Sequence, residues 1–252
     1  MRRAALATLT LAGALLALGV VIRAAADEWR APSILPQRFG LRGVEAAWSD
    51  PALRSALTSS LVIGVVVALL ALPIAWPAAR AVATTSRTAM LVTLLALPLL
   101  VPGYAVGTGL ATWLIRIGVP GGMTSIIVAH LPFVLAYEIL VLAPAFDRRV
   151  RQLEEAAVVL GASGVDRLRL VAGPAVAGAV AGAVFIGFTV SLTQYGTTLV
   201  VGAGTTTLPL LLVPFAQSDP QVAATLALLA TAPAIVAVAL ARRGRGGSTS
   251  VR

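Results

Sequence analysis

The 252-residue sequence contains no cysteine, no lysine and a single histidine, and each scarcity excludes a class of chemistry. Without cysteine there is no disulfide, thiol nucleophile or thiolate metal site. Without lysine a phosphate-binding loop of the GxxxxGKS/T type is impossible, so any ATP involved must be bound by another chain. His130 alone cannot form an HExxH zinc motif or a histidine cluster. We therefore expect no metal site and no cofactor.

Charged residues are also scarce. They make up 12% of the chain, about half the share that is usual in soluble domains, while hydrophobic residues make up 58%. This composition indicates a polytopic membrane protein whose apolar surface faces lipid. The net charge of +9 does not indicate nucleic-acid binding, because the arginines are separated by apolar runs and form no single basic face.

Long stretches without charge mark the predicted spans, since a helix crosses the bilayer with about 20 apolar residues. The longest stretch, 170–218, has room for two spans, but its segment GTTLVVGAGTTTLP is rich in glycine and threonine and is typical of a loop. We therefore expect an all-α polytopic membrane protein. Its six transmembrane helices are predicted at 4–22, 56–79, 89–111, 123–145, 174–195 and 221–241.

The arginines predict the orientation, because cytoplasmic loops collect positive charge. Six spans with both termini in the cytoplasm place most arginines inside, whereas seven spans would place the arginine-rich C-terminal end outside. Residues 1–26 have a second interpretation as a signal peptide that is cleaved near the alanines at 24–26. The uncharged run is longer than the 7–15 or so apolar residues of such signals, which favours a retained helix.

The predicted inside loop 147–173 has the pattern of two short helices. The first is expected to bury one apolar face, formed by Val150, Leu153, Ala157 and Leu160. Glu154 and Glu155 lie off that face. Gly161 is predicted to end the first helix, and Ser163 with Asp166 resembles a capping box that begins the second.

This loop resembles the EAA signature of ABC-importer permeases, EAA-x3-G-x9-I-x-L-P. The matching positions are Glu155, Ala156, Ala157, Gly161, Val171 and Pro174. Val171 replaces the isoleucine of the signature, and Gly173 replaces its leucine, which weakens the expected packing of the second helix. The resemblance covers about residues 55–245 and implies the fold of a type I ABC-importer permease. It also implies that the loop, including Ser163, contacts an ATPase.

As the resemblance implies, the chain is a transport subunit and not an enzyme. Its partners would be ABC ATPase subunits, a second permease subunit in a homo- or heterodimer, an extracytoplasmic substrate-binding protein and the lipid of a bacterial plasma membrane. The expected organisation is a first helix and outside loop at 1–54, a permease core at 55–245 and a disordered tail at 246–252. The segments LALPLLVPGYAVGTGL and FTVSLTQYGTTLVVGAGTTTLPLLL are similar to the branch that imports thiamine, iron(III), polyamines or oxyanions.

Polar residues within the apolar runs are candidates for a substrate pathway, because polar groups in a membrane usually face a cavity or a partner helix. The candidates are Ser191, Thr193, Gln194, Tyr195, Glu138 and Tyr104. Glu138 has an equally good interpretation as a protonated acid that is hydrogen-bonded to a neighbouring helix. His130 is interpreted as a packing residue.

Two other functions are weighed against the importer. Glu138 and His130 could relay protons in a secondary transporter, although such proteins usually carry internal repeats and none is visible here. Residues 161–164 also spell GxSG, the serine motif of rhomboid-like intramembrane proteases, with Ser163 as nucleophile and His130 as base. We expect these two residues near opposite membrane faces, which argues against the protease.

Overall fold

The computed structural model describes residues 2–85 and 87–246, and most of these residues are helical. The chain forms two compact units, one of residues 1–61 and 205–252 and one of residues 62–204. The long helix α3 (Pro51–Thr84) begins in the first unit and ends in the second.

Four helical segments in the described part of the chain are long and apolar enough to cross a membrane. They are Leu6–Ala24, Pro51–Thr84, Met123–Ala145 and Gly164–Leu192. The number rises to five if the bent pair Met90–Leu100 and Gly103–Arg116 counts as one span. The prediction of an all-α protein with several apolar spans is thus confirmed, while the number six stays a prediction.

The predicted span 89–111 is wrong as one continuous helix. The structure divides it into α4 (Thr88–Leu100) and α5 (Gly103–Arg116), which meet at an angle of 91°. Val101 between them is extended, with ψ of 132°. The cause is Pro102, because a proline disfavours helical backbone at the residue before it and has no amide to donate.

The first unit is built around α12 (Pro220–Gly246), which contains the predicted span 221–241. It packs against α1 (Arg2–Ala24), α2 (Arg42–Ser49) and α11 (Leu208–Ser218). Between α1 and α2 the strands β1 (Ala26–Glu28) and β2 (Arg38–Phe39) pair antiparallel. Gly246 ends α12, and the rest of the predicted disordered tail lies outside the described residues.

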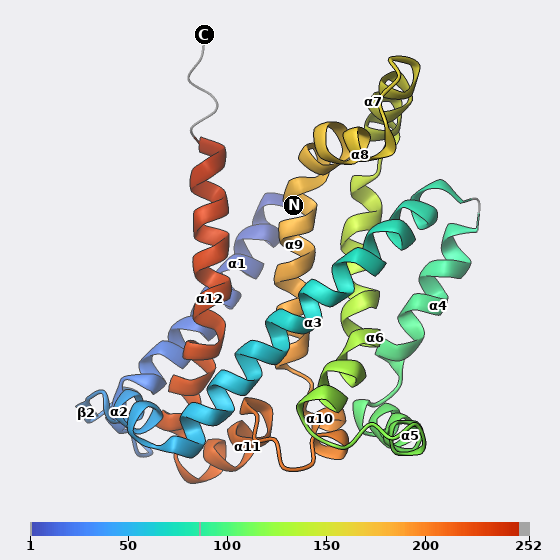
Figure 1. Ribbon diagram of the computed structural model, residues 1–252. Helices are drawn as coiled ribbons and strands as arrows, with labels where there is room; N and C mark the ends of the chain where they lie inside the picture. The colour runs from blue at the N-terminus through green and yellow to red at the C-terminus, as the bar shows by residue number, and fades with distance from the viewer. Residues whose placement is uncertain (1, 86, 247–252) are drawn as a thin grey trace. The chain divides into compact units, whose positions relative to one another are not determined.

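The second unit is organised by α6 (Met123–Leu142) and α9 (Gly173–Leu192), which pack against each other. At one end of this pair α5 packs against α10 (Tyr195–Val201). At the other end lie α7 (Arg148–Val159) and α8 (Gly164–Asp166) (Figure 1). The C-terminal half of α3 presents Ala71, Ala75 and Ala79 to the core at a spacing of four residues, and all three are fully buried. Such small side chains let helices approach closely where lipid provides no hydrophobic drive for association.

Candidate functional site

A hairpin of two short helical arms connects α6 to α9. Its elements are η1 (Ala143–Ala145), α7 (Arg148–Val159), α8 (Gly164–Asp166) and the π-helical η2 (Arg167–Ala172). Gly161 ends the first arm with φ of +82°. The amide of Gly161 donates to the carbonyl of Val158, and that of Ala162 donates to Ala157, each at 2.9 Å. This pair of bonds is a Schellman turn, which favours glycine at the left-handed position.

Ser163 begins the second arm, as the sequence predicts. Its hydroxyl oxygen accepts a hydrogen bond of 3.2 Å from the amide of Asp166. In return the Asp166 carboxylate accepts from the Ser163 amide at 3.2 Å and from the Ser163 hydroxyl at 2.6 Å. The glycine turn and the capping box together fix the angle between the two arms, so the predicted helix, turn and helix are confirmed.

The face of α7 that packs against the protein differs from the predicted one. Val150 and Glu154 are buried, whereas Leu153 is 47% exposed and Leu160 is 86% exposed. The prediction that Glu154 lies off the packed face is therefore wrong. The physical reason is an ion pair that gives Glu154 a partner on another helix, which an apolar pattern cannot reveal.

That partner is Arg80, near the end of α3. Its guanidinium nitrogen Nη2 lies 2.9 Å from Glu154 Oε2. The guanidinium carbon also lies 5.7 Å from the centroid of the Phe146 ring. Phe146 in turn packs edge-on against Trp76, with 5.1 Å between the ring centroids. The ion pair and the two rings therefore attach the first arm of the hairpin to α3.

Beside this ion pair is a pocket of about 190 Å³. Its lining residues are Arg80, Thr84, Phe146, Arg151, Glu154, Glu155, Val158 and Arg167. The Nε atom of Arg167 is buried and has no hydrogen-bond partner among the described residues. The lining thus carries three guanidinium groups and two carboxylates, so the pocket is polar and contains charges of both signs.

The contribution of this ion pair to stability can be tested by replacing two adjacent glutamates, one of which is the control. Glu154→Ala is expected to lower the free energy of unfolding by about 1–2 kcal/mol, because it removes a charge-assisted hydrogen bond of a buried carboxylate while Arg80 stays half-exposed. Glu155→Ala, at an exposed position, is expected to change it by less than about 0.5 kcal/mol. Thermal unfolding of the purified variants in detergent measures both, and equal midpoints would show that the ion pair is not structural.

The signature residues are mostly accessible. Glu155, Ala156, Gly161, Ser163 and Pro174 are exposed, and Ala157 is half-buried. The exposed apolar side chains of Val158, Val159 and Leu160 lie beside them at the end of the first arm. The hairpin thus presents a mixed acidic and apolar surface that its own unit does not cover.

Gly173, the departure from the signature, has a steric reason. A Cβ atom at this position would lie 2.6 Å from the carbonyl oxygen of Leu168. The expectation that Gly173 weakens the packing of the second arm stays a prediction, because this contact lies within the turn itself. The glycine permits the close passage from the π-helical turn η2 into α9.

His130 joins three helices at the other end of the unit. It is buried on α6, with Nδ1 2.9 Å from Ser191 Oγ and Nε2 2.9 Å from Thr198 Oγ1. The Thr198 hydroxyl donates its one proton to the carbonyl of Gln194 and therefore accepts from Nε2. These bonds place a proton on Nε2, and Ser191 is the partner of Nδ1. The interpretation of His130 as a satisfied packing residue agrees with this geometry.

The other predicted pathway residues divide by exposure. Gln194, at the break between α9 and α10, is half-buried and accepts a hydrogen bond of 3.1 Å at Oε1 from Thr197. Thr193 and Tyr195 are exposed, and so is Tyr104 on the neighbouring α5. The structure thus brings all the predicted pathway residues except Glu138 to the end of the unit where α5 and α10 meet. His130 completes this polar group through its bonds to Ser191 and Thr198, and it was not predicted to belong to it.

Glu138 is separate from this group. It is fully buried, and neither carboxylate oxygen has a hydrogen-bond partner among the described residues. The facing helix presents Gly187, where a Cβ atom would lie 2.6 Å from Glu138 Oε1 and 2.8 Å from Val134 Cγ1. The interpretation of Glu138 as hydrogen-bonded to a neighbouring helix is therefore not supported. An ionisable group in such a place is a candidate functional residue, because its burial is costly.

Two glycines of α9 test this close contact. Gly187→Ala is expected to destabilise the protein by about 1–3 kcal/mol, because the added methyl group collides with Glu138 and Val134. Gly182→Ala is the matched control, since its Cβ would come no nearer than 3.9 Å to Val141 and alanine favours the helix. Thermal unfolding in detergent compares the two variants. A Gly187→Ala protein as stable as Gly182→Ala would mean that α6 and α9 pack less closely than described.

The structure does not bring together the two residues of the protease hypothesis. The Ser163 hydroxyl bonds to Asp166 in the hairpin, while both ring nitrogens of His130 are occupied by Ser191 and Thr198. Ser163 therefore lacks the histidine base that the protease hypothesis requires. No group of three or more metal-ligating side chains occurs within residues 2–85 and 87–246.

No model of a known protein family matches the chain, and no curated protein matches it in sequence.

Proposed function

We propose that the chain is the permease subunit of an ATP-driven ABC importer, with the type I permease fold and six spans. The observation that carries this proposal is the hairpin. The residues that resemble the EAA signature form two short arms with a fixed turn, and they leave Glu155 and the apolar end of α7 exposed. This is the surface expected of a segment that docks on a separate protein.

In this proposal the hairpin transmits movement as a rigid body. The glycine turn and the capping box hold the arms to each other, and the ion pair of Arg80 with Glu154 holds the first arm to α3. When ATP closes the ATPase dimer, the docked hairpin shifts α6, α9 and α3 together. The nucleotide then changes the balance between inward-open and outward-open states, because the ATPase contacts differ between them.

The substrate pathway is proposed to include the polar group where α5 meets α10, at the opposite end of α6 and α9 from the hairpin. Gln194, Tyr195 and Tyr104 offer amide and phenol groups there, beside the hydrogen-bonded Ser191. The other subunits proposed are ABC ATPases, a second permease and an extracytoplasmic binding protein that selects the substrate. The proposed location is a bacterial plasma membrane with both termini in the cytoplasm.

Charge reversal on α7 tests the docking surface. Glu155→Arg is expected to reduce ATPase co-purification roughly thirtyfold, as a loss of about 2 kcal/mol at an interface charge pair would. Gln152→Arg, exposed on the same helix, introduces the same side chain and is the control; it raises the charge by one unit, against two for Glu155→Arg. The measurement is pull-down of tagged permease with an ABC ATPase encoded beside it, after a check that both variants insert equally. Equal recovery of the ATPase with both variants would contradict the proposal.

The turn gives a second test. Gly161→Ala has open space for its methyl group but retains φ of +82°, which costs about 1–2 kcal/mol in a residue other than glycine. Gly164→Ala, in the helical second arm, has no such cost and its Cβ meets nothing nearer than 3.8 Å. We expect substrate-stimulated ATP hydrolysis in vesicles to fall in the first variant only. Hydrolysis unchanged in both would show that coupling does not depend on the shape of the turn.

Glu138 favours one alternative, a proton-coupled secondary transporter, because it is a buried carboxyl group without a partner. Uptake into vesicles separates the two functions. The importer requires ATP and its ATPase, and we expect Glu138→Gln to retain ATP-driven uptake. Uptake that is driven by a pH gradient in the chain alone, and is lost in Glu138→Gln, would favour the alternative.

A further inference from the structure

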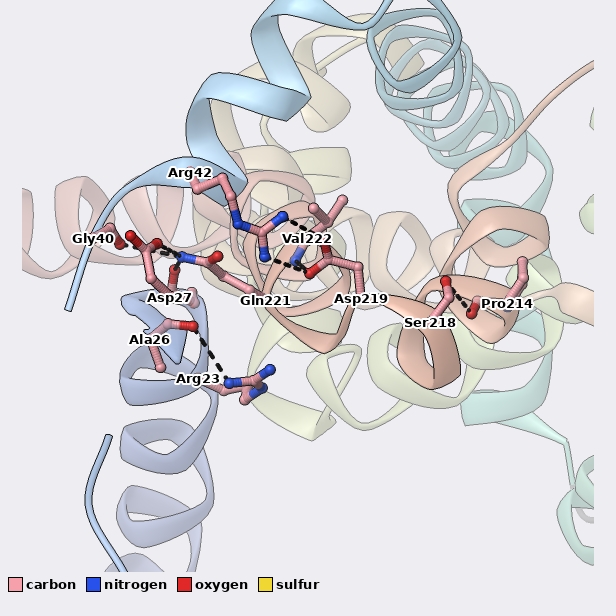
Figure 2. A network of polar contacts seen from close by, with 11 residues as sticks. Arg23, Ala26, Asp27, Gly40, Arg42, Pro214, Ser218, Asp219, Gln221 and Val222 are labelled. Carbon is pink, nitrogen blue, oxygen red and sulfur yellow. Dashed lines mark hydrogen bonds and ion pairs between the residues drawn. The ribbon is translucent and has the colours of Figure 1, made fainter. Parts of the chain in front are cut away.

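The segment between α1 and α3 is fastened to the start of α12 (Figure 2). Gln221 is fully buried, and its amide nitrogen donates to Asp27 Oδ1 at 2.8 Å, to the Gly40 carbonyl at 3.2 Å and to the Ala24 carbonyl at 3.3 Å. One glutamine thus joins the end of α1 to both sides of the strand hairpin. The connecting segment therefore has a defined place on its own unit.

An ion pair also attaches this segment to the residue that precedes α12. The guanidinium of Arg42 makes two hydrogen bonds to the Asp219 carboxylate, at 2.5 and 3.0 Å (Figure 2). These bonds hold the pKa of Asp219 below its usual range, so the pair stays charged at neutral pH. Next to it, a side chain at Gly43 would meet the Thr225 hydroxyl of α12. Helix α2 consequently lies directly on α12.

Helix α2 has three distinct faces. Gly43 and Ala47 are buried, at a spacing of four residues that places them on one face. Leu41, just before the helix, continues a second face with Val44 and Trp48 at spacings of three and four, and all three are exposed. Polar residues lie between these faces. The second face is therefore a row of large apolar side chains that the described residues leave uncovered.

The loop before α2 adds to this apolar surface. Ile34 is 88% exposed, and Leu35 and Phe39 are also exposed. Arg30, Arg38 and Arg54 are exposed around them. Large apolar groups beside arginines are typical of segments that lie in the boundary between lipid headgroups and acyl chains.

The position of this segment in the chain determines where its apolar surface lies relative to the membrane. The segment begins where the candidate span Leu6–Ala24 ends and finishes where the candidate span Pro51–Thr84 begins. Both span ends that it joins must therefore lie at the same membrane face. Because Gln221 and Arg42 hold the segment down, its apolar side chains stay at the level of that face and not far out in the water.

We propose that Ile34, Leu35, Phe39, Leu41, Val44 and Trp48 form an interfacial surface that inserts into the phospholipid bilayer around the ends of α1 and α3. The apolar side chains enter the acyl boundary, and the arginines contact lipid phosphates. This inference concerns how the chain sits in the membrane and does not depend on the proposed importer function.

The absence of cysteine from the chain makes the test direct. Single nitroxide labels at Leu41→Cys and Trp48→Cys report the apolar face, and one at Glu45→Cys, exposed on the polar face of the same helix, is the control. The full-length protein is reconstituted in vesicles of phosphatidylethanolamine and phosphatidylglycerol. Collision with oxygen, which concentrates in lipid, is then compared with collision with a water-soluble nickel chelate.

We expect labels 41 and 48 to collide mainly with oxygen, and label 45 mainly with the nickel chelate. Val44→Cys repeats the measurement if Trp48→Cys does not fold, as judged by thermal unfolding. Equal nickel accessibility at 41, 45 and 48 in vesicles would overturn the proposal. So would labels 41 and 48 that face water in vesicles and become protected only when a soluble binding protein is added, because the surface would then be a protein-docking site.

Discussion

Close approach between helices is the constraint on which the rest of this structure depends. In a bilayer the lipid is as apolar as the helix surfaces, so helices associate through packing and hydrogen bonds rather than through the removal of apolar surface from water. The alanines of α3 and Gly187 of α9 supply that approach, since each of these residues contributes no side chain larger than a methyl group. Only because the helices are this close can His130 reach hydroxyl groups on both α9 and α10.

Two buried polar residues of the second unit, His130 and Glu138, differ in the hydrogen-bond partners that this packing provides. The ring of His130 has a partner at each nitrogen, so its orientation is fixed by the protein. Glu138 lies in the same interface between α6 and α9 but faces a glycine and an apolar side chain. A residue of the first kind maintains the structure, whereas a residue of the second kind has hydrogen-bonding capacity that the described residues leave unused.

Local patterns in the sequence predicted the features that depend on local physics. Charge-free runs identified most helices, and Gly161 with the Ser163 capping box identified the hairpin, because a turn and a cap are each set by residues a few positions apart. The pair of Arg80 and Glu154 was not predictable in this way, since its partners are distant in the sequence and an apolar periodicity treats a glutamate as exposed. The bend before Pro102 did have a local signal, the proline itself, but the long uncharged run outweighed it.

The second arm of the hairpin continues into α9 without a non-helical residue. Within residues 164–192 the departure from α-helix is the π-helical turn Arg167–Ala172, and π-turns are places where helices bend. A change in the angle of the hairpin would therefore be absorbed first at this turn, before it reached the bond between Ser191 and His130 near the far end of α9.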